Sequence, residues 1–247
     1  MGAQNAAKRE KLPKTAAAGK KPLSKPASVK KTSPAAARSA HKGDRGQPYH
    51  HGDLHEALLK AAKTVAEREG INGLTLRAVA REAGVSHAAP AHHFGDVTGL
   101  LSELAAIGFR KFSEQLGAAT CSEVAPEAVA ARKASAYVAF AQDNPCMFQL
   151  MFRGERLDHD RPALREASEA AFIKLANIVA ARRHEEVVPD HLTLEQAADI
   201  ARIWSMVHGF AMLYLDGRLS PIMDGLPPGT TVEALLATMM TPDHRPI

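Results

Sequence analysis

The string LTLRAVAREAGVSHAAPAHHF, at residues 74–94, constrains the fold of this chain more than any other stretch. Thr75 can cap a helix with its hydroxyl, and the residues that follow predict that helix. Gly84 ends the pattern and tolerates the left-handed backbone of a tight helix exit. The apolar residues between them recur at helical spacing and predict one buried face: Leu76, Val79, Ala80 and Ala83.

A second short helix is predicted directly after this turn. Ser86 stands where an N-cap would start it, and it runs through His93. A helix, a glycine turn and a helix, with the small Ala80 where the two approach, form the plan of a helix-turn-helix. In that plan the second helix enters the major groove of DNA. An ordinary corner between two helices fits the same string, so the flanking sequence is needed to distinguish it from a helix-turn-helix.

Length and composition favour a helical protein with a real core. The chain has 247 residues, of which 45% are hydrophobic and only 5% aromatic, which suits helical packing better than a β-sandwich. No apolar run approaches the ~20 residues that cross a bilayer, and no signal peptide is apparent. We therefore expect no membrane partner. Cys121 and Cys146 form no CxxC pair, which is typical of a cytoplasmic protein.

The charge is distributed unevenly along the chain. Residues 1–48 hold twelve Lys or Arg and two acidic residues, a net charge of +10, whereas the remainder carries −6. The first stretch is rich in Lys, Ala, Pro and Ser and is predicted to be a disordered tail. Its charge favours contact with DNA phosphates. A passive extension, or a start codon placed too early, explains the tail equally well.

Residues 49–70 predict the first folded helix. Asp53 and Glu56 have the spacing of a capping box, and Gly70 closes the far end. This helix can brace the pair that follows and complete a three-helix domain. The nearby His50, His51 and His55 raise the question of a metal, but no matched Cys or Asp ligand set accompanies them, so surface histidines and no metal site are expected.

The strings YHHGDLHEALLKAA and GLTLRAVAREAGVSHAAPAHHF, followed by a helix from about Val97, resemble the N-terminal domain of the TetR family of transcriptional regulators. The likeness runs from about Tyr49 to Leu104 and rests on the AGVS turn, the His93–Phe94 pair and the spacing to Leu100. The resemblance implies double-stranded DNA as partner. It also implies the DNA-binding positions, which are Thr75, Arg77, Ser86, His87, Ala88, His92 and His93.

Two residues depart from the pattern of that family. Ala91 stands where the family usually has a phosphate-contacting tyrosine, and Val97 where it usually has a lysine. Each missing contact removes part of the salt-dependent attraction to DNA and leaves base reading unchanged. Pro90 lies in the first turn of the short helix, where a missing amide costs least.

Four or five further helices are predicted after Pro126. On the helix predicted at residues 161–185, the expected inner side holds Ala170, Ile173, Leu175, Ile178 and Val179. The strings YVAFAQDNPCMFQLMF and IWSMVHGFAML resemble a C-terminal domain class of the TetR family named for its Trp-His-Gly residues, here Trp204, His208 and Gly209. The expected helices cover residues 97–119, 127–144, 146–152, 161–185, 194–219 and 231–240.

A small-molecule effector would bind in this second domain, because helix bundles hold ligands between helices in mostly apolar pockets. His208 is the best candidate for a polar anchor. For any single member of the set a place in the core is the better explanation, and for His208 the two explanations are equal. The candidate ligand-binding residues are Tyr137, Phe140, Met147, Phe148, Met151, Phe172, Trp204 and His208.

We therefore interpret the chain as an all-α regulator, a repressor released by a small apolar or amphipathic effector. The expected divisions are a tail at residues 1–48, a helix-turn-helix domain at 49–96 and a helical ligand-binding and dimerisation domain at 97–247. The resemblance implies a homodimer joined through residues 194–219 and 231–240. A ligand-binding protein with weakened DNA recognition is the alternative that Ala91 and Val97 suggest. A weak enzyme is the third interpretation, but no catalytic motif, catalytic residue or cofactor site is found.

Overall fold

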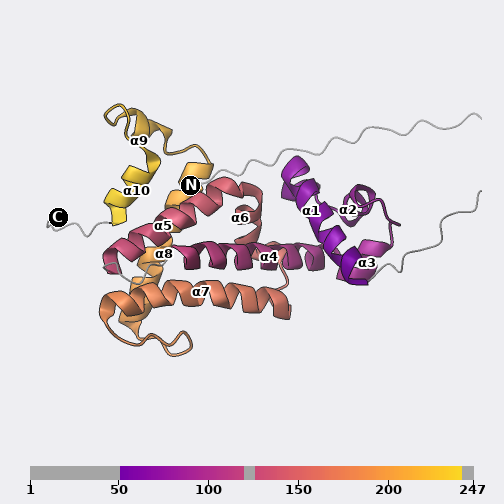
Figure 1. Cartoon of the computed structure of the whole chain (residues 1–247), viewed down its shortest axis with the longest axis horizontal. Helices are drawn as coiled ribbons and strands as arrows, with labels where there is room; N and C mark the ends of the chain where they lie inside the picture. The colour runs from indigo at the N-terminus through magenta and orange to yellow at the C-terminus, as the bar shows by residue number, and fades with distance from the viewer. Residues whose placement is uncertain (1–50, 120–125, 241–247) are drawn as a thin grey trace, which may run out of the picture. The chain divides into compact units, whose positions relative to one another are not determined.

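The computed structural model describes residues 51–119 and 126–240, and every regular element within them is a helix. The all-α prediction is confirmed. Figure 1 shows the arrangement of these helices. In chain order they are α1 (His51–Gly73), α2 (Leu76–Glu82), α3 (Ala89–Phe94), α4 (Val97–Ala118), α5 (Pro126–Asp143), α6 (Pro145–Met151), the 3-10 turn η1 (Gly154–Arg156), α7 (Pro162–Arg183), α8 (Leu194–Leu215), α9 (Ser220–Asp224) and α10 (Val232–Met240).

The helix starts follow local side-chain chemistry. Thr75 accepts the Ala78 amide at 3.1 Å, and Asp96 accepts the Gly99 amide at 2.8 Å, so both satisfy amides that a helix leaves unpaired at its first turn. Thr193 begins α8 with a full capping box that includes the side chain of Gln196. The starts of these helices are therefore determined largely by residues next to them in sequence.

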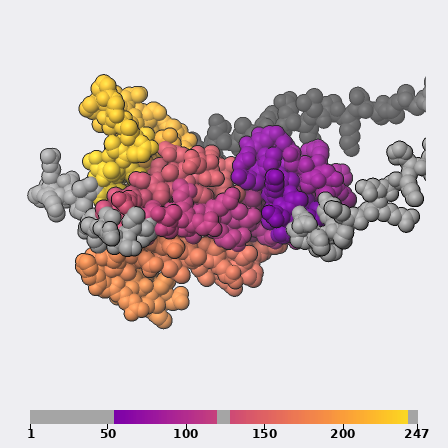
Figure 2. Space-filling model, in the orientation of Figure 1, coloured from indigo at the N-terminus to yellow at the C-terminus, as the bar shows by residue number. Residues whose placement is uncertain are grey.

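Helix α4 organises the packing. It lies along α7 and also contacts α1, α5 and α6 (Figure 1). In the space-filling view the first helices, α1–α3, lie directly against the region of α4–α6 (Figure 2). Leu58 of α1, Leu104 of α4 and Leu164 of α7 are all buried in one continuous apolar cluster. Within the described residues no helix is long and apolar enough to span a membrane.

Two of the sequence-based helix boundaries are wrong. Ser86 does not cap α3: its carbonyl accepts the Ala89 amide in a turn, and the helix begins only at Ala89. Helix α8 ends at Leu215 instead of residue 219, because Gly217 adopts a φ of 69° and the Arg218 amide turns back to the Leu213 carbonyl.

The predicted inner side of α7 is partly wrong as well. Ala170 and Ile173 are exposed, Leu175 is half-buried, and Ile178 and Val179 are buried as expected. An alanine-rich helix offers more than one apolar stripe, and contact with α4 selects the stripe that starts at Leu164. Three further expectations lie outside the described residues: the basic tail at 1–48, the Asp53 side chain of the capping box, and Cys121.

Candidate functional site

Helices α2 and α3 form a compact helix-turn-helix. Gly84 has a φ of 68°, as predicted, and this left-handed residue lets the Val85 amide donate to the Ala80 carbonyl at 3.0 Å. Val85 is half-buried and packs on the core at the corner, while Pro90 lies in the first turn of α3. The turn therefore has a fixed geometry and orients α3 relative to α2.

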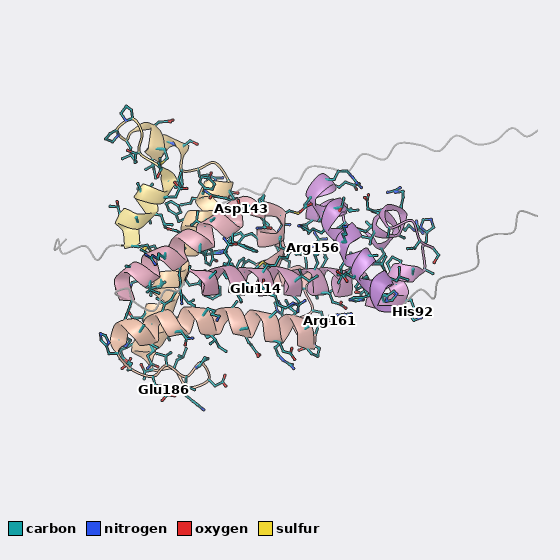
Figure 3. All side chains as sticks on the ribbon, in the orientation of Figure 1. His92, Glu114, Asp143, Arg156, Arg161 and Glu186 are labelled. Atoms are coloured by element: carbon teal, nitrogen blue, oxygen red, sulfur yellow. The ribbon has the colours of Figure 1, made fainter. Side chains whose placement is uncertain are left out.

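Most of the predicted DNA-binding residues are exposed on this unit. His92, labelled in Figure 3, lies on α3 at the end remote from the α4–α10 bundle. His93 is half-buried, and its ring lies 5.7 Å from that of His55 and 6.3 Å from that of Phe94. His93 thus packs inside the three-helix unit. The exposed members of the set are Thr75, Arg77, Ser86, His87, Ala88 and His92.

His55 is engaged with protein groups. Its Nε2 lies 2.9 Å from a carboxylate oxygen of Glu103, and its ring lies 5.0 Å from that of Phe94. The side chains of His50 and His51 lie outside the described residues, and within those residues no group of His, Cys, Asp or Glu has the arrangement of a metal site. His55 therefore links α1 to α3 and α4.

Arg161, which precedes α7, connects the end of α3 to the larger bundle of helices α4–α10. Its guanidinium donates to the backbone carbonyl of Phe94 at 2.8 Å and to the Glu103 carboxylate at 3.4 Å. Gly99 makes this approach possible, since a Cβ there would lie 2.1 Å from the Phe94 oxygen and 2.3 Å from an Arg161 nitrogen. The position of α3 therefore depends on one arginine and one glycine outside it.

A cavity of about 300 Å³ lies among the helices of the larger bundle. Its wall is almost entirely apolar, which is typical of small-molecule sites. Of the eight predicted ligand-binding residues it includes Tyr137, Met151, Phe172 and Trp204. The lining residues are Phe109, Phe112, Leu116, Ala130, Lys133, Ala134, Tyr137, Met151, Phe152, Gly154, His159, Ser168, Ala171, Phe172, Leu175, Ile178, Ile203, Trp204, Val207 and Met240.

The other four predicted residues do not line this cavity. Phe140 and Phe148 are fully buried core residues, and Met147 packs against α4 at Gly108. His208 is half-buried and lies behind the wall, where its Nδ1 hydrogen-bonds the Tyr137 hydroxyl at 2.8 Å. Their places follow from the contacts between helices, which a single helix period does not reveal.

Tyr137 connects α5 to α8. Its hydroxyl hydrogen-bonds Nδ1 of His208 at 2.8 Å. Burial raises the pKa of Tyr137 far above its ordinary value and lowers the pKa of His208, so both side chains are neutral at pH 7. This pair of neutral groups holds α5 and α8 together beside the cavity.

Several functional residues were not predicted from the sequence: Lys133, Phe152 and His159 line the cavity, and Arg156 and Arg161 contact α1 and α3. Lys133 could have been found, because it lies on the apolar stripe of α5, three residues after Ala130 and four before Tyr137. The other four residues lie around a loop with no periodic pattern, so nothing in the sequence singled them out.

This loop, the 152–161 segment, lines the cavity on one side and contacts α1 and α3 on the other. Phe152, Gly154 and His159 line the cavity. On the other side, Arg156 donates to the Asn72 side chain at 2.9 Å, and Arg161 holds the Phe94 carbonyl. Figure 3 shows both arginines on the side of the bundle nearest α1 and α3.

Comparison with known proteins agrees with this arrangement. Residues 58–104 match the model of the bacterial regulatory proteins of the tetR family, and residues 131–239 match that of the tetracyclin repressor-like C-terminal domain. The chain belongs to the TetR family. It is therefore a DNA-binding transcriptional regulator with the helix-turn-helix described above.

Solved structures have the same fold. A protein of unknown function from Rhodococcus sp. RHA1 is 33% identical to this TetR protein, with 79% of this chain and 95% of that one covered and a TM-score of 0.63. The TetR family transcriptional regulator PfmR from Thermus thermophilus is 19% identical, with 74% and 94% covered and a TM-score of 0.51. Their similarity extends over both parts of the TetR architecture.

A curated protein is similar to this chain over a shorter stretch. It is the uncharacterized HTH-type transcriptional regulator YobS of Bacillus subtilis (strain 168), 29% identical over 98 residues. The match covers 40% of this TetR chain and spans about half the length of that relative, 51%.

The two departures from the TetR pattern differ in their surroundings. Ala91 is exposed on α3, so a tyrosine there would meet solvent or DNA. Val97, the first residue of α4, is half-buried and packs on the core, so it has a structural task that the usual lysine would not perform.

We expect His87 and His92 to read bases. Replacing either with alanine should lower the discrimination between operator and random DNA by about 1–3 kcal/mol, because a good base contact is worth that much. Binding isotherms on both DNAs measure the difference. His191→Ala, at an exposed histidine before α8, is the control. Equal losses on both DNAs would mark a phosphate contact, and no loss would remove the residue from the interface.

Proposed function

We propose that the protein is a repressor that binds its operator as a homodimer and is released by a small apolar or amphipathic effector in the bundle cavity. In this proposal residues 49–96 read DNA, and residues 97–247 bind the effector and the second subunit. The exposed face of the helix-turn-helix would contact DNA through the six exposed residues named above. The 300 Å³ apolar cavity would hold the effector.

The main support for this proposal is that the 152–161 segment contacts both the cavity and the end of α3. One side of it lines the cavity, and the other side holds the end of α3 through Arg161. Its position is fixed to α4, because the buried Ser102 hydroxyl accepts the Asp158 amide at 2.8 Å. An effector that displaces Phe152 or His159 would therefore move this segment and, through Arg161, shift α3.

A ligand can shift this equilibrium only as far as it binds one arrangement more tightly than the other. The repressing arrangement must present two α3 helices at half-sites about 34 Å apart on one face of the DNA. A small rotation of α3 about its Arg161 attachment changes this spacing. The proposed effector therefore favours an arrangement that does not match the operator.

Selection of bound fragments from the source genome, with the purified full-length chain, tests the DNA-binding part. We expect enrichment of a palindromic site with half-sites one helical turn apart, bound with a strong salt dependence. Failure to enrich any fragment over random DNA would overturn the proposal. It would favour a ligand-binding protein with weakened DNA recognition, to which the loss of a tyrosine at Ala91 points.

The dimer proposal rests on apolar surface that the subunit leaves uncovered. On α8, Leu213 is 43% exposed and lies two turns from the half-buried Met206. On α10, Met239 is 42% exposed and follows the half-buried Leu235. A helix that is apolar on more than one side needs a second cover, which a partner subunit provides.

We expect Leu213→Asp to raise the dissociation constant of the dimer at least tenfold, because burial of a leucine is worth about 1.5–3 kcal/mol. Light scattering across micromolar concentrations measures the change. Leu194→Asp is the matched control, since Leu194 lies on the same helix and is 81% exposed outside this stripe. A monomeric parent protein at micromolar concentration would contradict the proposal.

A further inference from the structure

Lys133 is the one lysine or arginine among the described residues that line the cavity. It lies on α5 between Ala130 and Tyr137, which also line it, and only 8% of the residue is exposed. A lysine residue is rarely this little exposed without a partner for its ammonium group, since partial removal from water disfavours the charge. The rest of the wall around it is apolar apart from a few polar groups.

Within the described residues the Lys133 side chain has neither an ion pair nor a hydrogen bond. The charged group that acts on it there is another cation, Lys174 of α7, and no carboxylate of the described part of the chain offsets this repulsion. Burial and this neighbour both lower the pKa of Lys133. The charge on Lys133 would therefore be stabilised by an anion that enters the cavity.

The other polar groups of the wall offer little competition. The Ser168 hydroxyl donates to the Arg165 carbonyl at 3.0 Å, and the Tyr137 hydroxyl is engaged with His208. His159, from the 152–161 segment, offers no negative charge, and no Asp or Glu is among the described residues that line the wall. Lys133 is thus the group that sets the charge preference of the cavity.

We propose that the effector is an organic anion with an apolar body, whose carboxylate binds Lys133 and whose body lies along Phe112, Phe172 and Val207. This inference rests on the proposed function, because it assigns a chemical class to the effector of the same cavity. A cationic ligand is disfavoured by both lysines. A neutral apolar ligand would fill the cavity but leave the ammonium group unpaired.

Three amphiphiles with a linear chain of ten carbons and different head groups test this assignment: decanoate, decanol and decyltrimethylammonium. Trp204 lines the cavity and is the only tryptophan of the chain, so its fluorescence reports binding without DNA. We expect decanoate to bind at least tenfold more tightly than decanol, and decyltrimethylammonium to bind least. A charge-assisted hydrogen bond accounts for a factor of about 10 to 100.

Lys133→Met should remove the preference, with decanoate weakened about 10- to 100-fold and decanol within about threefold of the parent. Lys133→Arg should keep it. Lys174→Met is the matched control outside the wall and should change the decanoate affinity less than Lys133→Met does. Because Lys133→Met removes a buried charge, its melting temperature should not fall; if it does not fold, Lys133→Gln provides the same test.

Equal binding of the three compounds, no response to any of them, or a decanoate preference that survives Lys133→Met would overturn the inference. The outcome is independent of the repressor proposal, since no operator enters the assay. Tight decanoate binding without any effect on the operator would contradict the release mechanism and leave the assignment of Lys133 intact.

Discussion

Gly99→Ala is expected to weaken operator binding at least tenfold. The added Cβ would lie 2.1 Å from the backbone oxygen of Phe94, and a backbone atom cannot move aside as the end of a side chain can. Such overpacking typically costs about 1–3 kcal/mol. Here we expect it to displace α3 and the Arg161 attachment together.

Gly117→Ala is the matched control for this substitution. Gly117 lies on the same helix, and its added Cβ would meet nothing closer than the Lys174 ammonium at 4.0 Å. Thermal melting and operator titration of both variants separate the effects. Gly99→Ala with the operator affinity of Gly117→Ala would show that the close approach at Phe94 does not position α3.

Deleting residues 1–45 is expected to weaken operator and random DNA binding alike and to flatten the slope of log K against log salt by several units. The body of residues 49–247 carries −6 and is repelled from DNA at long range, while residues 1–48 carry +10. In this hypothesis the arm supplies affinity and the helix-turn-helix supplies specificity. Titrations at several salt concentrations measure both quantities.

The deleted protein also tests the missing phosphate contact on α3. Ala91→Tyr in that background should recover part of the affinity, because residue 91 is exposed. Val97→Lys should recover less, since Val97 packs on the core and its replacement costs packing. An unchanged affinity and salt slope after the deletion would make the arm a passive extension.

The helix-turn-helix could be predicted from sequence because its determinants are local. The Thr75 cap and the left-handed Gly84 are decided within a few residues, and both predictions are confirmed. The prediction that Ser86 caps α3 is wrong. Serine is a good N-cap in general, but here Pro90 and the turn before it determine where α3 begins.

The cavity could be predicted only in part, because its wall comes from several helices and one loop. Met151 lines it, but Phe148, almost one turn earlier on the same short helix, is fully buried on another side. No single helix period distinguishes these two residues. The contact of Arg161 with the Phe94 carbonyl joins residues 67 apart in sequence, and no local rule predicts it.

In the proposed mechanism, occupancy of the cavity controls operator binding through the 152–161 segment. Its most direct test is the operator affinity of the full-length chain at fixed salt, with and without decanoate at a concentration that saturates the Trp204 signal. Coupling between sites is typically worth about 5- to 150-fold in affinity, and we expect decanoate to weaken operator binding at least tenfold. An operator affinity that stays unchanged while the cavity is filled would contradict the account.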